Sequence, residues 1–190
     1  MVKLRFAPSP TGHLHVGNFR TALINFLFAK KNLGHFLLRI DDTDVERSKL
    51  IFEQSIKEDL NWSGINWDSE KKQSLRLDRY QEILDYLIQK ESIYPCFETP
   101  DQLLLKRKSL LSSGKPPIYD RSSLNLSKTE IRKKIDEGLK PHYRFKLKLE
   151  NVIWKDIIRG KITYNMSNVS DPIVVREDGR FIYTLASVID

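Results

Sequence analysis

The chain has 190 residues, of which 40% are hydrophobic and 30% charged, as is usual for a globular protein with a sizeable core. No apolar run reaches the about 18 residues of a membrane span, and Met1 leads straight into an expected strand, so we expect neither a membrane segment nor a secretory signal. The single cysteine, Cys96, excludes an internal disulfide framework and a cysteine cluster for zinc. These observations favour a reducing, cytoplasmic setting.

The charge is divided unevenly along the chain. Residues 1–70 contain 9 Lys and Arg against 9 Asp and Glu, whereas residues 71–190 contain 23 against 16 and so carry the whole net charge of +7. A basic region beside a neutral one favours a polyanionic partner for the second part. A well-solvated surface would show the same imbalance, so charge alone leaves both interpretations open.

The first 40 residues predict a strand–helix–strand unit. Residues 2–7 are rich in apolar side chains and end at Pro8, as a strand would. Residues 15–32 predict a helix, because apolar residues recur at spacings of three and four and build one buried stripe. The stripe consists of Val16, Phe19, Leu23, Phe26 and Leu27. With a second strand at 35–40, this is a βαβ unit, so the two strands should be parallel.

Further helices and short strands are expected in the rest of the chain. Apolar spacing and end signals predict helices at 50–62, 79–90, 100–113 and 127–138. Alternation from residue 142 onwards predicts strands. Their segments are HYRFKLKL (142–149), NVIWKD (151–156), KITYN (161–165), DPIVVRE (171–177) and RFIYTLASVI (180–189).

This order of elements predicts the fold class and the domains. We expect an α/β fold in which the first half of a Rossmann-type parallel sheet is interrupted by an α+β insertion. The expected boundaries are 1–75 for the nucleotide-binding part, 76–180 for the insertion, and 181–190 for the return into the first domain.

A ligand site is expected where the first two strands end, because ligands bind at the carboxyl ends of parallel strands. The loop Ala7–Gly17 leads into a helix N-terminus, which favours an anion such as phosphate. The loop after the second strand presents the carboxylates of Asp41, Asp42 and Asp44. Such a site could hold a nucleotide beside a cationic amine.

Several competing interpretations apply to this site. Two common phosphate-binding motifs are absent: the crossover contains no G-x-G-x-x-G, and the chain contains no G-x-x-x-x-G-K-[ST]. In their place is a Ser-Pro-Thr-Gly turn, in which Gly12 permits positive φ. His13 and His15 follow this turn. His15 could simply cap the helix, and Asp42 and Asp44 could cap the helix that starts at residue 50. A calcium loop is rejected, because Arg47 stands where the sharp turn would need glycine.

Several blocks resemble one known family. RFAPSPTG (5–12) and HVGN (15–18) resemble the class I aminoacyl-tRNA synthetase signature in its glutamyl form, with HVGN at the place of the family's HIGH tetrapeptide. LRIDDTD (38–44) resembles the second family block, with Asp41 at a position that is often Glu. SDP (170–172) and YTLASVID (183–190) resemble the segment that returns to the nucleotide fold. The resemblance covers the entire chain, and its blocks occur in family order.

The resemblance implies an activity and its partners. It implies a Rossmann-type catalytic domain split by an insertion that binds the tRNA acceptor stem, and the basic second part agrees with tRNA phosphates as its partner. Glutamate would attack the α-phosphate of ATP, which carries Mg²⁺, and the adenylate would then transfer glutamate to the tRNA terminus. The expected tRNA is tRNA(Glu), with tRNA(Gln) left open, and the protein is expected to act as a monomer without a membrane.

The resemblance also implies roles for individual residues. Amino-acid binding falls to Arg5, Ala7, Ser9, Asp41, Tyr183 and Ser187. ATP binding falls to Thr11, His15 and Gly17, of which Thr11 and His15 are the catalytic candidates. Arg5 could instead meet Asp41 or solvent, Ser187 stands where other members often carry Asn, and Tyr183 and Ser187 could be ordinary strand or helix-start residues.

Some family features are missing from the sequence. No stretch resembles the KMSKS loop. The nearest lysine cluster, Lys106-Arg107-Lys108-Ser109, is interpreted as the exposed face of a helix. An anticodon-binding domain is absent too. We therefore expect a truncated chain that does not aminoacylate tRNA alone. Only Cys96 stands where some relatives carry a Cys-x-Cys zinc site, so no zinc is expected. The alternatives are a glutamyl-queuosine tRNA synthetase relative, a non-enzymatic tRNA-binding module, and a non-tRNA nucleotidyltransferase.

Overall fold

The computed structural model describes all residues 1–190, and the chain divides into two compact units, Met1–Tyr80 and Gln81–Asp190. Because the arrangement of the two units relative to each other is not determined, each is described by itself. The division follows Tyr80, and residues 181–190 group with the second unit.

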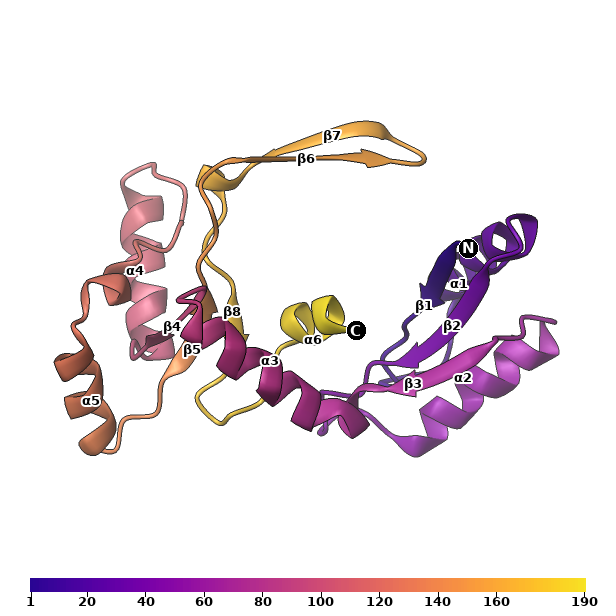
Figure 1. The fold of residues 1–190 in the computed structure, drawn as a ribbon, viewed down its shortest axis with the longest axis horizontal. Helices are drawn as coiled ribbons and strands as arrows, with labels where there is room; N and C mark the ends of the chain where they lie inside the picture. Colours follow the sequence, from indigo (N-terminus) through magenta and orange to yellow (C-terminus); the bar gives the residue numbers. More distant parts are fainter. The chain divides into compact units, whose positions relative to one another are not determined.

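The first unit is a parallel sheet with helical crossovers. Strand β1 (Lys3–Phe6) pairs with β2 (His35–Ile40), which in turn pairs with β3 (Ser69–Lys72), all in parallel (Figure 1). Helix α1 (Val16–Lys31) connects β1 to β2, and α2 (Leu50–Trp62) connects β2 to β3. The predicted βαβ unit and the α/β class are confirmed. The sequence pattern does not predict β3, because its residues SEKK include no apolar side chain.

Helix α1 packs on the sheet through a face that coincides only in part with the predicted stripe. Val16 and Leu27 are 84% and 56% exposed, so their assignment to the buried stripe is wrong. The fully buried positions are Ala22 and Ala29, seven residues apart on one face. Phe19, Leu23 and Phe26 are partly buried against the same core, as predicted. Small side chains thus occupy the helix positions that lie deepest.

Close approach of the chain explains one glycine of this unit. A Cβ on Gly34 would lie 2.6 Å from the carbonyl oxygen of Val2, a separation that no side chain tolerates. His35 N–H then donates to that same carbonyl at 2.8 Å. The C-cap residue of α1 is Asn32. Gly34 is therefore required by the packing of the chain that enters β2.

The second unit contains an antiparallel sheet and a separate hairpin. The sheet has the order β4 (Ile93–Cys96), β5 (His142–Phe145), β8 (Ile173–Val175). The hairpin consists of β6 (Asn151–Asp156) and β7 (Gly160–Asn165), which pair only with each other. Both are much as alternation predicted, although β5 and β8 are shorter and β4 was not predicted.

Helices complete the second unit. Helix α3 (Leu77–Gln89) begins in the first unit and continues into the second. It is followed by α4 (Pro100–Ser112) and α5 (Lys128–Asp136), both of which begin with a capping box. Short 3₁₀ turns lie before, between and after these elements. They are η1 (Gln73–Arg76), η2 (Ser122–Asn125) and η3 (Met166–Asn168).

The segment RFIYTLASVI does not form the predicted strand. It enters helix α6 (Tyr183–Ile189) directly after a turn. The adjacent residues Leu185 and Ala186 are both buried, which a strand with alternating faces would not allow. The helical period of this segment was mistaken for alternation. Across both units, no helix combines the length and apolarity needed to cross a bilayer.

Candidate functional site

The carboxyl ends of β1 and β2 lie side by side, and backbone hydrogen bonds join the loops that follow them. Asp41 N–H donates to the carbonyl oxygen of Pro8 at 3.0 Å, and Lys49 N–H donates to that of Pro10 at 2.9 Å. The loop after β1 is thereby fixed to the end of β2 and to the start of α2. The predicted meeting of these two loops occurs in the first unit.

Arg5, Ala7 and Ser9 lie at this edge of the sheet. Arg5 is exposed and forms no hydrogen bond or ion pair in the structure, so the alternative that it meets Asp41 is wrong. Ala7 is half-buried and Ser9 is exposed. The guanidinium group and a hydroxyl group are therefore both open to a ligand at the same edge.

Asp41 is buried and its carboxylate is held by a residue that the sequence analysis missed. Arg39 Nε donates to Asp41 Oδ1 at 2.7 Å, and Arg39 Nη2 donates to Oδ2 at 3.0 Å. Both side chains are almost fully buried. A signal was available, since Arg39 interrupts an apolar strand two positions before Asp41 and alternation puts both on one side. Such a two-pronged pair fixes the carboxylate rigidly.

Asp42 belongs to a network that joins the ends of β2, β3 and α2. Its Oδ1 accepts from Ser74 N–H at 2.8 Å, and Lys72 Nζ lies 3.6 Å from its Oδ2. Lys72 also donates to Glu53 Oε2 at 2.7 Å, and Lys57 donates to Glu53 Oε1 at 2.9 Å. Burial raises the pKa of Glu53, but the hydrogen bonds from the two lysines outweigh burial and leave it below its usual value. The network thereby fixes the loop after β2 to α2 and to the end of β3.

Asp44 forms a tight turn of its own. Its carboxylate accepts from the Arg47 side chain at 2.7 Å and from the Arg47 N–H at 3.2 Å. The N-cap residue of α2 is Lys49, which makes no side-chain cap. The alternative that Asp42 and Asp44 cap this helix is therefore wrong, because both carboxylates satisfy other donors.

His15 caps α1, and its ring lies against Gly17. Its Nδ1 accepts from Gly17 N–H at 3.2 Å, as expected for a helix-start histidine. A Cβ on Gly17 would lie 3.1 Å from Cε1 and 3.2 Å from Nδ1 of that ring. Because Nδ1 accepts, a neutral imidazole carries its proton on Nε2, which can donate to a ligand. Glycine at position 17 thus gives the ring room to cap the helix.

Thr11 and Gly12 lie in the turn that leads to His15. Thr11 N–H donates to the Ser9 carbonyl at 2.8 Å, and the Thr11 side chain is exposed. Gly12 does not have the positive φ that the turn prediction allowed for, and no atom lies within 4 Å of a Cβ built on it. The turn therefore depends on Pro10 and this backbone bond rather than on glycine.

Tyr183 and Ser187 lie on α6 in the second unit. They are four residues apart, so they share one face of the helix. Tyr183 is 56% exposed and Ser187 is half-buried. Their position relative to the residues at the edge of the parallel sheet is not determined, so their assignment to the glutamate site stays a prediction.

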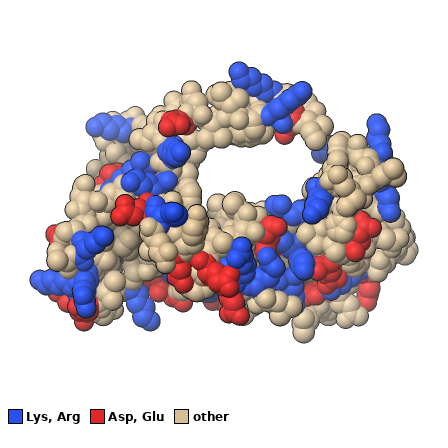
Figure 2. Space-filling model, in the orientation of Figure 1, with Lys and Arg blue, Asp and Glu red and all other residues tan.

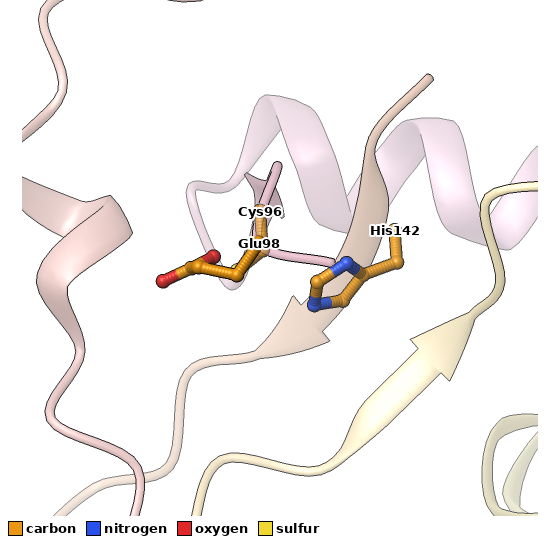
Figure 3. A group of neighbouring side chains, drawn as sticks. All are labelled: Cys96, Glu98 and His142. Atoms are coloured by element: carbon orange, nitrogen blue, oxygen red, sulfur yellow. The ribbon is translucent and has the colours of Figure 1, made fainter. Parts of the chain in front are cut away.

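A second cluster of polar side chains lies where β4 and β5 pair. One ligand-type atom each of Cys96, Glu98 and His142 lies within 4.8 Å of the others (Figure 3). Cys96 and His142 are direct partners across the two strands, and Glu98 follows the end of β4. This cluster is where a metal would have to bind in the second unit.

The Glu98 carboxylate is already well supplied with donors. It accepts from the Tyr119 hydroxyl at 2.7 Å and from the Ser122 and Ser123 hydroxyls at 2.9 Å. Burial raises its pKa, but these hydrogen bonds and one from its own backbone outweigh burial and hold the pKa at about 2. Glu98 is therefore an ionised hydrogen-bond acceptor that joins the end of β4 to Tyr119 and to η2.

The other two groups of the cluster favour their neutral forms. Burial raises the pKa of the Cys96 thiol, whereas a metal-binding thiolate needs a lowered pKa. Burial lowers the pKa of His142, and the neighbouring Arg144 guanidinium lowers it further. A nearby cation opposes metal binding as well. The raised thiol pKa and the nearby guanidinium disfavour a metal, whereas the neutral imidazole of His142, whose buried Nε2 has no hydrogen-bond partner, is the form that can bind one.

Asp171 is a buried centre of hydrogen bonding in the second unit. Its Oδ2 accepts from the Tyr94 hydroxyl at 2.7 Å, and its Oδ1 accepts from Arg121 Nη2 at 2.6 Å and from Leu147 N–H at 3.0 Å. Its carbonyl oxygen accepts from Arg144 Nη1 at 2.6 Å. One carboxylate thereby joins β4, the residue before η2 and the segment that follows β5.

The sequence matches one protein family along its whole length. The family model described as tRNA synthetases class I (E and Q), catalytic domain, matches residues 1–190. The glutamate–tRNA ligases 1 of Rickettsia massiliae and Rickettsia prowazekii are each 55% identical over 186 residues, which are 98% of this chain and 42% of each relative.

Solved structures show the same similarity in three dimensions. A glutamate–tRNA ligase from Elizabethkingia meningosepticum, solved in complex with its amino acid, matches 100% of this chain and 41% of its own, with a TM-score of 0.91 and 36% identity. A glutamate–tRNA synthetase from Elizabethkingia anophelis matches equally well over 42% of its chain. The chain spans less than half the length of these relatives. It belongs to the family of class I tRNA synthetases of the glutamate and glutamine type, and it carries that family's catalytic-domain sequence from residue 1 to residue 190.

Proposed function

We propose that the chain takes part in the ATP-dependent attachment of glutamate to tRNA. The glutamate carboxylate attacks the α-phosphate of ATP, and pyrophosphate leaves. A hydroxyl of the tRNA's terminal adenosine then attacks the carbonyl of glutamyl-adenylate, and AMP leaves. The observation that carries this proposal is that the exposed Arg5 and Ser9 side chains and the fixed Asp41 carboxylate all lie at the edge where parallel sheets bind ligands. The similarity to glutamate–tRNA ligases supports the choice of substrate.

On the amino-acid side, we assign one charged residue of the chain to each of two oppositely charged groups of glutamate. Arg5 binds the side-chain carboxylate through its two-pronged guanidinium, and Asp41 accepts from the α-ammonium group. The two hydrogen bonds from Arg39 hold the Asp41 carboxylate in place for this role. Ala7 and Ser9 contact the amino acid from the loop. The family resemblance adds Tyr183 and Ser187, on α6 of the second unit, as further amino-acid-binding residues.

On the nucleotide side, Thr11, His15 and Gly17 bind ATP at the start of α1. His15 donates from Nε2, because Nδ1 is committed to the helix cap. The Thr11 hydroxyl and the helix N-terminus add further donors for phosphate. Catalysis then consists of positioning and of stabilising negative charge on the α-phosphate. Mg²⁺ would arrive with ATP and neutralise its phosphates, and we assign no residue of this chain to it.

The second unit is proposed to bind the tRNA. The second unit contains 19 Lys and Arg against 15 Asp and Glu, a net charge of +4, and Figure 2 shows the basic side chains mixed with acidic ones rather than gathered in one field. Such a surface suits interactions with individual phosphates. No zinc is assigned here, since Glu98 and its hydroxyl donors hold the segments that a metal would otherwise join.

A binding experiment tests the amino-acid assignment. Calorimetric titration of the chain with a non-hydrolysable glutamyl-adenylate analogue, and with its glutaminyl counterpart, should show tighter binding of the glutamyl form. Arg5→Met should weaken glutamyl-analogue binding by about tenfold or more, because methionine cannot form the charge-assisted, two-pronged pair with the carboxylate. It should also remove the preference over the glutaminyl analogue.

The matched control is Lys3→Met. It removes a cation from the same side of β1, two residues further from the strand's carboxyl end. It should leave both affinities unchanged. An Arg5→Met chain that keeps its affinity and its preference would refute the role of Arg5, and a wild-type chain that binds neither analogue would refute the proposed function.

A further inference from the structure

A cavity of about 610 Å³ lies in the second unit, between α4 and the chain that follows this helix. Figure 1 shows that chain running back beside α4. The volume is in the range of sites for small organic molecules, about 300–1,000 Å³. None of the residues that line it is assigned to glutamate or to ATP, so the proposed function leaves the cavity without a role.

Helix α4 contributes an apolar wall to the cavity. Leu103, Arg107 and Leu110 line it and recur at spacings of four and three, so they share one side of the helix. No residue of α4 is buried, and neither hydrophobic core includes one. On the other side, Pro117 and Ile118 add apolar surface. The leucines of α4 thus face an open cavity instead of packing on a core.

A stacked pair of side chains forms a further part of the lining. The Arg144 guanidinium carbon lies 4.0 Å from the centroid of the Tyr119 ring, and both residues line the cavity. Arg144 is 7% exposed; its Nη1 donates to the carbonyl oxygen of Asp171 at 2.6 Å, whereas its Nε has no hydrogen-bond partner. A buried N–H donor without a partner is rare and costs stability. This nitrogen is therefore a donor that an acceptor group of a ligand would satisfy.

The charges that line the cavity favour an anion. Asp120 is the one acidic residue of the lining, and its Oδ2 already lies 3.0 Å from Lys106 Nζ. Arg107 is exposed and forms no ion pair. The guanidinium groups of Arg107 and Arg144 are thus the cations that remain for a ligand. Such a group binds a carboxylate through two parallel hydrogen bonds.

Hydrogen bonds hold the walls of the cavity in place without a ligand. Lys106 Nζ donates to the Ser122 hydroxyl at 2.8 Å and so joins α4 to the returning chain. Tyr119 N–H donates to the Ser170 hydroxyl at 2.9 Å, and the Tyr119 hydroxyl donates to Glu98 at 2.7 Å. A preformed cavity binds a small rigid molecule without the ordering cost that a flexible peptide segment carries. The fixed walls therefore favour a small ligand over a segment of a partner protein.

We propose that this cavity binds a small organic carboxylate with a flat, apolar body. The body packs between the leucines of α4 and the stacked pair of Tyr119 and Arg144, and the guanidinium groups of Arg107 and Arg144 bind the carboxylate. Glutamate does not fit this description, because it is charged at both ends and has no apolar ring. The proposal is independent of the proposed function, since it uses none of the residues assigned to glutamate or ATP.

Two aromatic probes test the proposal on the 190-residue chain by NMR titration. Naphthalene-2-carboxylate carries the charge, and naphthalene-2-carboxamide has the same body without it. The carboxylate should bind saturably at about millimolar concentration or below, with shift changes confined to α4, residues 117–120 and β5. The Nε–H signal of Arg144 should shift as it gains an acceptor. The carboxamide should bind about tenfold more weakly, because it cannot form the charge-assisted pair.

Four variants of α4 separate charge from apolar contact. Arg107→Gln should weaken carboxylate binding by about fivefold and leave the carboxamide unchanged, whereas Lys108→Gln, which does not line the cavity, should change neither. Leu110→Ala should weaken both probes by about fivefold, because it removes part of the apolar wall. Leu111→Ala, at a 54% exposed position outside the cavity, should weaken neither. Since α4 contains no buried residue, all four chains should fold, and the amide spectra of the free variants check this.

Several outcomes would overturn the carboxylate site. They are the absence of saturable binding, shift changes outside the three segments, and wild-type affinity for the carboxylate in Arg107→Gln. Equal binding of both probes, with a loss in Leu110→Ala, would also overturn it and would point to an apolar groove for a protein side chain instead. None of these results bears on the titration with glutamyl-adenylate analogues, so the proposed function is tested separately.

Discussion

Each unit of the chain buries an aspartate beside an arginine, but the two pairs are assembled differently. In the first unit, Asp41 is held by Arg39, two residues earlier on the same strand. In the second, Asp171 is held by Tyr94, Arg121 and Leu147, which are 77, 50 and 24 positions away. The first pair follows from strand alternation, whereas the second exists only once distant segments have come together.

The two kinds of pair have different consequences: local contacts position the ligand site in the first unit, whereas long-range contacts stabilise the second unit. The first unit fixes its ligand-binding edge by local geometry: parallel strand ends, a helix cap and backbone bonds between neighbouring loops. The second unit is more dependent on polar side chains, because the aspartate at its centre satisfies donors from several segments. Removal of one partner should therefore have consequences of different size and location in the two units.

The largest effect is expected for Asp171→Asn. The variant leaves the charge of Arg121 without its anion and the Tyr94 hydroxyl and Leu147 N–H with poorer acceptors. We expect a loss of about 4 kcal/mol in the free energy of unfolding. Urea unfolding measures the loss, and amide exchange should locate it in β4, β5 and β8.

Asp178→Asn is the control for this variant. Asp178 lies in an exposed turn and pairs with Arg180 close by in the chain, so its replacement should cost less than about 1 kcal/mol. If both variants lost the same stability, the long-range bonds of Asp171 would not hold the unit together.

A somewhat smaller effect is expected for Arg39→Met, about 3 kcal/mol, because it removes the guanidinium that pairs with the buried Asp41 carboxylate. The increase in amide exchange should fall on β1 and β2 and spare the second unit. The double variant Arg39→Met/Asp41→Leu removes both charges and should regain most of the stability, since an apolar pair can replace a buried ion pair. Arg5→Met, an exposed position without an ion pair, serves as the control, and a double variant as unstable as Arg39→Met would contradict a pairwise interaction.

The sequence predicted the first unit better than the second, because the contacts that shape the first unit form between residues close together in the chain. The βαβ order, both crossover helices and the loop that holds Ser9 beside Asp41 depend on short-range patterns. Strand β3 was missed, because SEKK becomes a strand only through its pairing with β2. Arg39 was missed because its partner was assigned to the substrate instead, although the spacing of two residues was visible.

The second unit was predictable in its elements but not in its connections. Capping boxes at Thr99 and Ser127 showed where α4 and α5 begin. No local pattern shows that Glu98 meets Tyr119 or that Asp171 meets Tyr94, since these pairs close loops of 21 and 77 residues. Helix α6 was mistaken for a strand, and the burial of the adjacent Leu185 and Ala186 became visible only in the packed unit. The placement of Tyr183 and Ser187 in the glutamate site stays a prediction on the same grounds.

The smallest of the three effects concerns Glu98 and depends on pH. Its pKa of about 2 in the folded chain lies below the about 4.3 of an unfolded glutamate, so its ionised form is the one that the fold stabilises. The stabilisation is complete above about pH 5 and is lost as the pH falls towards 2, where the folded chain also takes up the proton. Glu98→Gln should therefore lower the free energy of unfolding by about 2 kcal/mol at pH 7 and by much less at pH 3.

Urea unfolding of both chains across this range measures the difference. Glu130→Gln is the exposed control, because a glutamine at this position can still form the capping box of α5. A difference that stayed constant with pH would show that Glu98 contributes through its shape and through neutral hydrogen bonds alone. The negative charge of Glu98 would then not be what stabilises the contact between the end of β4 and η2.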